Sequence, residues 1–223
     1  MMGTIVNTAA IIVGALLGTF IGNKLKNRYK NTAMQGLSLA VILIGLEMAL
    51  DTENVSIIIF SLLLGGLIGE FFQIESHLRS AGDWFENRMK GQGQVAEAFI
   101  QCSLIYCVGA MAIMGAIQDG LLNDPSTLYA KSMLDGFTAI AFSSTLGIGV
   151  ILAAIPVFLY QGTITVMAGF LKPLLTDPVI NEMTATGGLL IVGIGLNLLN
   201  ITEIKVGNLL PSLLVAVILV FIL

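Results

Sequence analysis

Two aspartates in apolar surroundings have the greatest potential for chemistry in this chain. Asp119 and Asp135 occupy the related motifs "QDG" and "LDG", at or just inside the ends of adjacent apolar segments. A carboxylate inside a bilayer costs at least about 2.5–3.5 kcal/mol on insertion scales, so it needs a partner or a function. One interpretation is an acidic vestibule, joined by Asp124, for cations or polar solutes. The alternative is capping at helix ends together with an ion pair, because Lys131 precedes Asp135 by one helical turn.

Further polar residues lie within or at the ends of apolar segments. The sequence contains weak internal similarities between residues 34–53 and residues 134–203. In this alignment Gln35 corresponds to Asp135, and Glu47 corresponds to Asn197. Hydroxyl groups lie in the stretch "SSTLGIGV", where they could contact an ion or simply form a turn. The predicted substrate- or ion-binding residues are Asp119, Asp135, Gln118, Gln35, Glu47, Asn197, Ser143 and Ser144. Hydrogen bonding between helices is the structural alternative for the uncharged ones.

Several kinds of chemistry have no motif in the sequence. His77 is the single histidine, and Cys102 and Cys107 are spaced so that they do not lie side by side on a helix. Phosphate-binding loops, dinucleotide fingerprints and nucleophile–base pairs are absent. We therefore expect no catalytic residues, no cofactor, no metal site and no nucleic-acid partner, and the protein is not expected to be an enzyme.

The composition requires a membrane environment for the elements that carry these residues. Hydrophobic residues make up 56% of the 223 residues, charged residues 11%, and the mean hydropathy is +0.94. A soluble domain carries about 25% charged residues. The apolar runs are continuous rather than alternating, which predicts an all-α, polytopic bundle of transmembrane helices.

The apolar runs predict seven or eight spans. The eight candidate spans are 3–22, 33–50, 55–73, 97–117, 131–147, 149–171, 182–200 and 206–223. The stretch 131–172 must break, because one helix of that length would be about twice as long as the hydrocarbon core is thick. Positive charges in the first loop, "KLKNRYK", and in the loop after the third span place those loops in the cytoplasm. The N-terminus is then outside.

Weak internal similarities suggest a repeat. "MQGLSLA" (34–40) resembles "LDGFTAI" (134–140), and "IGLEMALDTE" (44–53) resembles "IGLNLLNITE" (194–203). They predict a first three-span repeat over 1–73, a second, inverted one over 97–171, and a C-terminal helix pair over 182–223. The segment 74–96 between them is expected to be an amphipathic interfacial helix.

Glycines recur at helical spacing in two of the predicted spans. Gly14, Gly18 and Gly22 form one stripe, and Gly65 and Gly69 form another. Small residues let helices approach closely in lipid, where the helix backbone is already hydrogen-bonded. We expect these glycines to pack helices within or between subunits, and the first stripe suggests a homodimer.

Three stretches resemble a known family. "CVGAMAIMGAIQDGL" (107–121), "KSMLDGFTAIAFSSTLGIGV" (131–150) and "MTATGGLLIVGIGLNLL" (183–199) are similar to the bacterial YdfK/YqgA-type inner-membrane proteins, a family of unknown function. The resemblance implies a polytopic bacterial membrane protein, often regarded as a possible transporter. It implies no substrate and no functional residues.

The repeats and the intramembrane acids together favour transport. Inverted repeats are characteristic of transporters, whose solute sites lie near the repeat interface. We expect a transporter or channel for a small ion or polar solute, working between two pseudo-symmetric halves. The alternative is a membrane scaffold or regulatory protein without transport activity. The expected partners are the lipid bilayer, the solute and a second copy of the chain.

Overall fold

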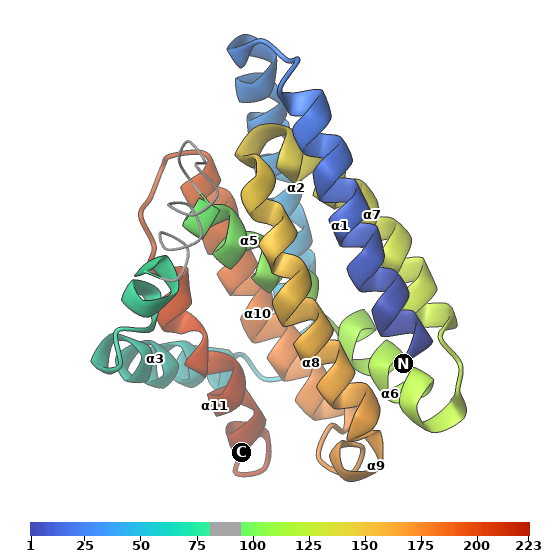
Figure 1. Cartoon of the computed structure of the whole chain (residues 1–223). Coiled ribbons are helices and arrows are strands. Elements are labelled where there is room, and N and C mark those ends of the chain that lie inside the picture. Colours follow the sequence, from blue (N-terminus) through green and yellow to red (C-terminus); the bar gives the residue numbers. More distant parts are fainter. Residues whose placement is uncertain (81–94) are drawn as a thin grey trace. The chain divides into compact units, whose positions relative to one another are not determined.

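The computed structural model describes residues 1–80 and 95–223, and all of their regular structure is helical (Figure 1). The all-α class predicted from the sequence is confirmed for these residues. The helices are α1 (Met2–Gly22), α2 (Asn27–Leu50), α3 (Val55–Phe71), a short helix (Ile74–Ser80), α5 (Val95–Cys107), α6 (Ala110–Leu122), α7 (Ser126–Leu146), η1 (Ile148–Ala153), α8 (Ala154–Val166), α9 (Ala168–Leu171), α10 (Asp177–Leu198), η2 (Val206–Leu209) and α11 (Pro211–Val220). The expected interfacial helix over 74–96 is helical as far as Ser80, and its remainder up to residue 94 lies outside the described residues.

Four described helical stretches are long and apolar enough to cross a membrane. They are Met2–Gly22, Asn27–Leu50, Ile148–Val166 and Asp177–Leu198, and the number rises to six if two bent helix pairs each count as one span. This is fewer than the seven or eight spans predicted from apolar runs. The predicted span 131–147 lies in α7, which carries Lys131 and Asp135, and the last apolar helix, Val206–Val220, is short.

The helices form two compact units, each assembled from two separate parts of the chain. Unit 1 comprises Met1–Met34 and Ala81–Pro173, and unit 2 comprises Gln35–Ser80 and Leu174–Leu223. The predicted division followed consecutive segments, whereas each unit combines an early and a late segment. The predicted repeat remains a prediction, because grouping by contact does not test similarity between segments.

In unit 1, α1 and α7 run side by side in the same direction (Figure 1). A Cβ atom on Gly14, Gly18 or Gly22 would collide with the backbone carbonyl of Gly136, Ile140 or Ser144, respectively. The paired positions increase together along both helices, so the helices are parallel. The glycine stripe therefore lies against the α7 backbone, where there is no room for a side chain.

Helix α8 and the bent pair α5–α6 run in the opposite direction to α1. Along α8, Gln161 meets Asn7 and Thr165 meets Thr4, so α8 is antiparallel to α1. The pair α5–α6 bends by 61° at a break between Cys107 and Ala110. Gly149 contacts Val95 near the start of α5, and Gly120 contacts Thr165 near the end of α6. The bent pair thus extends along the length of η1 and α8.

The chain reverses between α7 and α8 at the break predicted in "SSTLGIGV". Helix α7 ends at Leu146, and Gly147 has a φ of +82°, a backbone conformation that favours glycine. The Ser143 hydroxyl lies within hydrogen-bond distance of the carbonyl oxygens of Ala15 (2.6 Å) and Gly147 (3.0 Å), which share its single proton. The Ser144 hydroxyl bonds to Ala141 O on its own helix. These serines therefore stabilise the end of α7.

In unit 2, α10 packs antiparallel to the later part of α2, and α11 packs antiparallel to α3. A Cβ atom on Gly45 would lie 2.7 Å from Gly188 O. A Cβ atom on Gly65 or Gly69 would collide with the backbone of Ser212 or Asn208. The second predicted glycine pair therefore lies where the α3 backbone meets α11 and η2.

Two buried glutamates of unit 2 hold its loops. The Glu182 carboxylate accepts hydrogen bonds from Thr52 Oγ1 (2.7 Å) and from the backbone N–H groups of Glu53 (2.8 Å) and Asn54 (3.0 Å). The Glu75 carboxylate accepts from Gly207 N (2.8 Å) and Arg79 Nε (2.8 Å). Both carboxylates have donor groups around them, so they are structural.

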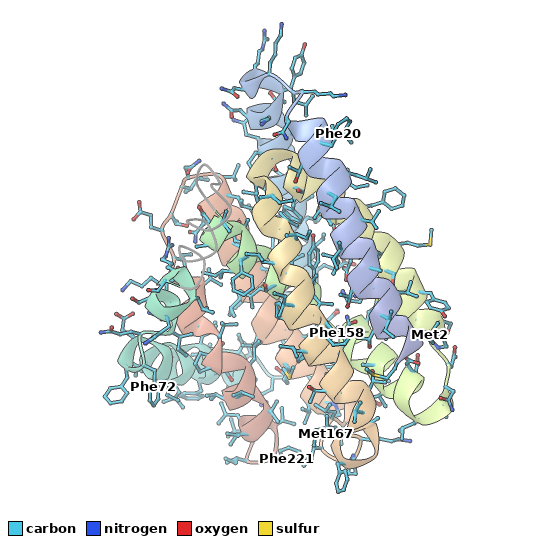
Figure 2. All side chains as sticks on the ribbon, viewed as in Figure 1. Met2, Phe20, Phe72, Phe158, Met167 and Phe221 are labelled. Carbon is cyan, nitrogen blue, oxygen red and sulfur yellow. The ribbon has the colours of Figure 1, made fainter. Side chains whose placement is uncertain are left out.

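The outer surfaces of the helices are apolar. Figure 2 shows large side chains projecting from the helices, among them Met2 and Phe20 at opposite ends of α1 and Phe158 on α8. These three side chains are 60%, 61% and 42% exposed. Exposed apolar side chains at this density fit contact with lipid, as the composition requires.

Candidate functional site: a buried polar cluster in unit 1

Lys131 and Asp135 form a buried ion pair on α7. The Lys131 ammonium lies 3.1 Å from the Asp135 carboxylate, and the two residues are 7% and 5% exposed. The pair spans one helical turn, as the i,i+4 spacing predicted. A buried charge is tolerated when it is paired and its remaining hydrogen-bonding capacity is used.

Two amide side chains from other helices complete the cluster. Asn7 on α1 donates from Nδ2 to Asp135 Oδ2 (3.0 Å) and to Gln161 Oε1 on α8 (3.3 Å). Both amide residues are 0% exposed. The polar cluster, defined here as Asn7, Lys131, Asp135 and Gln161, thus joins α1, α7 and α8.

The orientation of both amides follows from the carboxylate. An ionised carboxylate accepts hydrogen bonds but cannot donate them, so the group of Asn7 that faces Asp135 must be its NH₂. The same NH₂ faces Gln161, which must then present its carbonyl oxygen. This leaves Asn7 Oδ1 and Gln161 Nε2 buried without hydrogen-bond partners. The cluster therefore has one unused acceptor and one unused donor.

A break in a helix lies near this cluster. Helix α6 begins after Gly109, whose φ is +133°, with no side chain capping its N-terminus. Helix α5, which ends at Cys107, packs against α7, which carries Lys131 and Asp135. Interrupted helices in membranes leave backbone groups free to bind solutes, and they occur at the substrate sites of transporters.

Asp119 forms a separate polar contact in unit 1. This contact holds the start of α1. Its carboxylate accepts a hydrogen bond from Gly3 N (3.1 Å) and lies 2.8 Å from the amino nitrogen of Met1. Between this contact and the cluster, Thr4 and Thr165 face one another with their hydroxyl oxygens 3.4 Å apart. The two predicted aspartates are therefore both buried in unit 1, each with its own partners.

Comparison with known proteins places this architecture in a family. A model described as "Protein of unknown function (DUF554)" matches residues 2–221. The chain belongs to the DUF554 family. It is 33% identical over 226 residues to the uncharacterised membrane protein YdfK of Bacillus subtilis (strain 168), with 100% of this chain and 96% of YdfK covered. It is also 33% identical over 221 residues to the uncharacterised protein YqgA of Escherichia coli (strain K12), with 96% of this chain and 94% of YqgA covered. No solved structure matches.

The resemblance seen in the sequence is thereby confirmed, and this DUF554 chain is a membrane protein. The match covers nearly the whole chain and therefore includes the sequence of both units. The word "membrane" in the description of YdfK agrees with the apolar helices observed here.

Three of the other predicted site residues of this DUF554 chain lie in unit 1 but outside the polar cluster. Gln118 accepts a hydrogen bond from Thr127 Oγ1 (2.7 Å) where α6 turns into α7. Ser143 and Ser144 bond to backbone carbonyls near the opposite end of α7. Asp124, in the α6–α7 loop, accepts from the Ser126 N–H, and hydrogen bonds from Ser126 hold the pKa of that carboxyl below its usual value.

The remaining candidates belong to unit 2. Gln35 and Glu47 are exposed on α2. Asn197 closes the turn after α10, donating to Ile204 O (2.7 Å) and accepting from Ile204 N (2.9 Å) and Thr202 Oγ1 (2.8 Å). The geometry of Asn197 is that of a turn-forming residue.

Sequence reasoning did not select Asn7 and Gln161 as site residues. Each is a single amide in an apolar helix, a pattern that most often reflects a hydrogen bond between helices. They lie 154 positions apart, and the sequence offers no signal that they meet. Among the described residues, no group of three or more His, Cys, Asp or Glu side chains could hold a metal ion.

Proposed function

We propose that this DUF554 chain is a transporter or channel for a small ion or polar solute, and that the polar cluster in unit 1 forms its site. The observation that carries the proposal is a buried ion pair joined to two amides that retain an unused acceptor and an unused donor. Buried polar atoms without hydrogen-bond partners cost free energy. A solute that bonds to them would recover that cost.

The surroundings of the cluster support the same proposal. Ionisable residues within membrane helices are costly and typically lie on solute or ion pathways. The nearby break between α5 and α6 adds helix-end backbone groups of the kind that transporters use. No covalent step is part of this proposal, and the protein is proposed not to be an enzyme.

We also propose eight spans with the N-terminus outside the inner membrane, arranged as an inverted 3+3 repeat with a C-terminal helix pair. Within unit 1, α1 and α7 run one way, and α5–α6 and α8 run the other, as alternating spans require. The proposed first spans of the two triplets, α1 and α5–α6, are thus antiparallel, as inversion demands. This proposal counts α7 as a span despite its charged pair, because that pair is buried.

Purified protein in liposomes tests the transport proposal. We expect wild-type proteoliposomes to pass at least one probe from a panel of Na⁺, K⁺, Cl⁻, glycerol and urea faster than empty liposomes. Asp135→Asn should reduce that flux about tenfold or more, as expected from losing a charged hydrogen-bond partner. Glu47→Gln, on the exposed face of α2, should leave it unchanged.

Two results would contradict the proposal. One is flux through wild-type protein that never exceeds the empty-liposome rate for any probe. The other is flux that persists unchanged in the Asp119→Asn/Asp135→Asn double variant, which would remove both aspartates from the mechanism. Size-exclusion profiles and melting temperatures of the variants establish that the reconstituted protein is folded.

A further inference from the structure

We infer that the solute is an uncharged molecule that both donates and accepts hydrogen bonds, such as a small amide or urea, rather than an inorganic ion. This inference rests on the proposed function and narrows its substrate class. It follows from two features of the polar cluster: how its charges are paired and which polar atoms they leave unused.

The charges of the cluster are already satisfied by each other. The Lys131 ammonium lies within 3.1 Å of both Asp135 carboxylate oxygens, where a bound cation would have to lie. A cation at Asp135 would therefore have to displace Lys131, and an anion at Lys131 would have to displace Asp135. Either displacement would leave a buried charge without its partner, which is strongly unfavourable in a low-dielectric interior. An uncharged solute leaves the pair intact.

The unused atoms of the cluster have opposite hydrogen-bonding character. Asn7 Oδ1 can only accept, and Gln161 Nε2 can only donate. The two side chains are joined by the hydrogen bond from Asn7 Nδ2 to Gln161 Oε1, so the free acceptor and the free donor belong to neighbouring amides. A complementary solute presents an N–H or O–H to Asn7 and a carbonyl or hydroxyl oxygen to Gln161. Amides and urea have both groups.

Other groups near the cluster also lack a net charge. Thr4 and Thr165 contribute hydroxyls on the α1 and α8 side, and both are buried. Tyr106 contributes a buried phenol from α5, and its oxygen has no hydrogen-bond partner. Hydroxyls of this kind can serve either as donor or as acceptor. They suit a neutral polar molecule better than an ion that must exchange its full hydration shell.

Stopped-flow light scattering on proteoliposomes tests the inference. We expect urea and formamide to equilibrate at least about tenfold faster than in empty liposomes, while Na⁺, K⁺ and Cl⁻ cross at the empty-liposome rate. Gln161→Met keeps the side-chain volume but removes both the Nε2 donor and the Oε1 that accepts from Asn7, and it should slow urea about tenfold or more. Gln101→Met is the control for loss of a donor, because Gln101 is a buried glutamine of α5 whose Nε2 already donates to Glu97 on its own helix; its Oε1 is unpartnered, so only the donor is matched.

The outcomes separate this inference from the proposed function. Flux of an ion without accelerated flux of urea or formamide would overturn the inference and leave transport standing. Urea flux that is equal in Gln161→Met and wild-type protein would also overturn it. If neither ions nor neutral solutes cross faster than in empty liposomes, the proposed function itself fails. An Asn7→Leu variant provides a second test, because it removes the unused acceptor. It should also slow urea, and its ion leakage should stay at the empty-liposome rate.

Discussion

The stability of the polar cluster depends on each buried charge having its partner. Lys131 and Asp135 were recognisable from the sequence because an i,i+4 pair lies on one helix, where geometry is fixed by the helical repeat. Asn7 and Gln161 were not recognisable as members, because their approach depends on how three helices pack. Local spacing thus revealed half of the cluster, and tertiary structure supplied the other half.

Replacing Lys131 should therefore destabilise the protein more than replacing an exposed lysine. Lys131→Met leaves the Asp135 carboxylate buried with Asn7 as its remaining partner, a change that typically costs about 3–5 kcal/mol. Removing the stranded charge as well, in Lys131→Met/Asp135→Leu, should restore much of the loss. Thermal unfolding of the purified protein in detergent measures both effects.

Lys172 supplies the control for this prediction, because it is an exposed lysine of the same unit. Lys172→Met should melt within experimental error of the wild type. If Lys131→Met had the same melting temperature as Lys172→Met, the buried ion pair would not contribute to stability.

At the scale of helices, the contact between α1 and α7 depends on the absence of side chains. The glycine spacing in α1 was visible in the sequence, but its partner atoms are backbone carbonyls of α7. Carbonyl groups are present in every residue, so no pattern of side chains could identify that partner. The break between α5 and α6 was not predicted, because "CVGAMA" is apolar throughout and continues the hydrophobic run.

Adding a single methyl group should test the α1–α7 contact. Gly18→Ala places a Cβ against the backbone of Ile140, which must move to accommodate it. We expect a loss of about 1–3 kcal/mol in the free energy of unfolding, the usual cost of overpacking, as measured by denaturation in mixed detergent.

Gly36→Ala is the matched substitution. Gly36 lies in helix α2, and an added Cβ there meets nothing within 4 Å. Because alanine favours helices over glycine by about 0.5–1 kcal/mol, this variant should be neutral or slightly stabilising. Equal destabilisation by both substitutions would mean that helix propensity or lipid contact, and not the approach of α7, determines the effect.

At the scale of the whole chain, the compact units could not be inferred from the order of the segments. Unit 1 joins residues 1–34 to 81–173, and unit 2 joins 35–80 to 174–223. Hydropathy locates apolar segments along the chain but contains no information on which segments become neighbours.

The number of candidate spans differed from the predicted number for another physical reason. Helix α7 carries a charged pair on its buried face, and these charges lower its hydropathy.

The direction of the helices in unit 1 gives a prediction about membrane sidedness. Asp124 lies in the loop before α7, beside the α1 end that contains Gly3, whereas Lys24 follows the opposite end of α1. If α1 crosses the bilayer, these two positions face opposite sides. The positive charges of the first loop put Lys24 in the cytoplasm.

Asp124→Cys, in a Cys102→Ala/Cys107→Ala background, should react with a membrane-impermeant maleimide in intact cells, and Lys24→Cys should react only after permeabilisation. Labelling of both positions from one side would show that α1 does not span, and the eight-span arrangement would then be wrong.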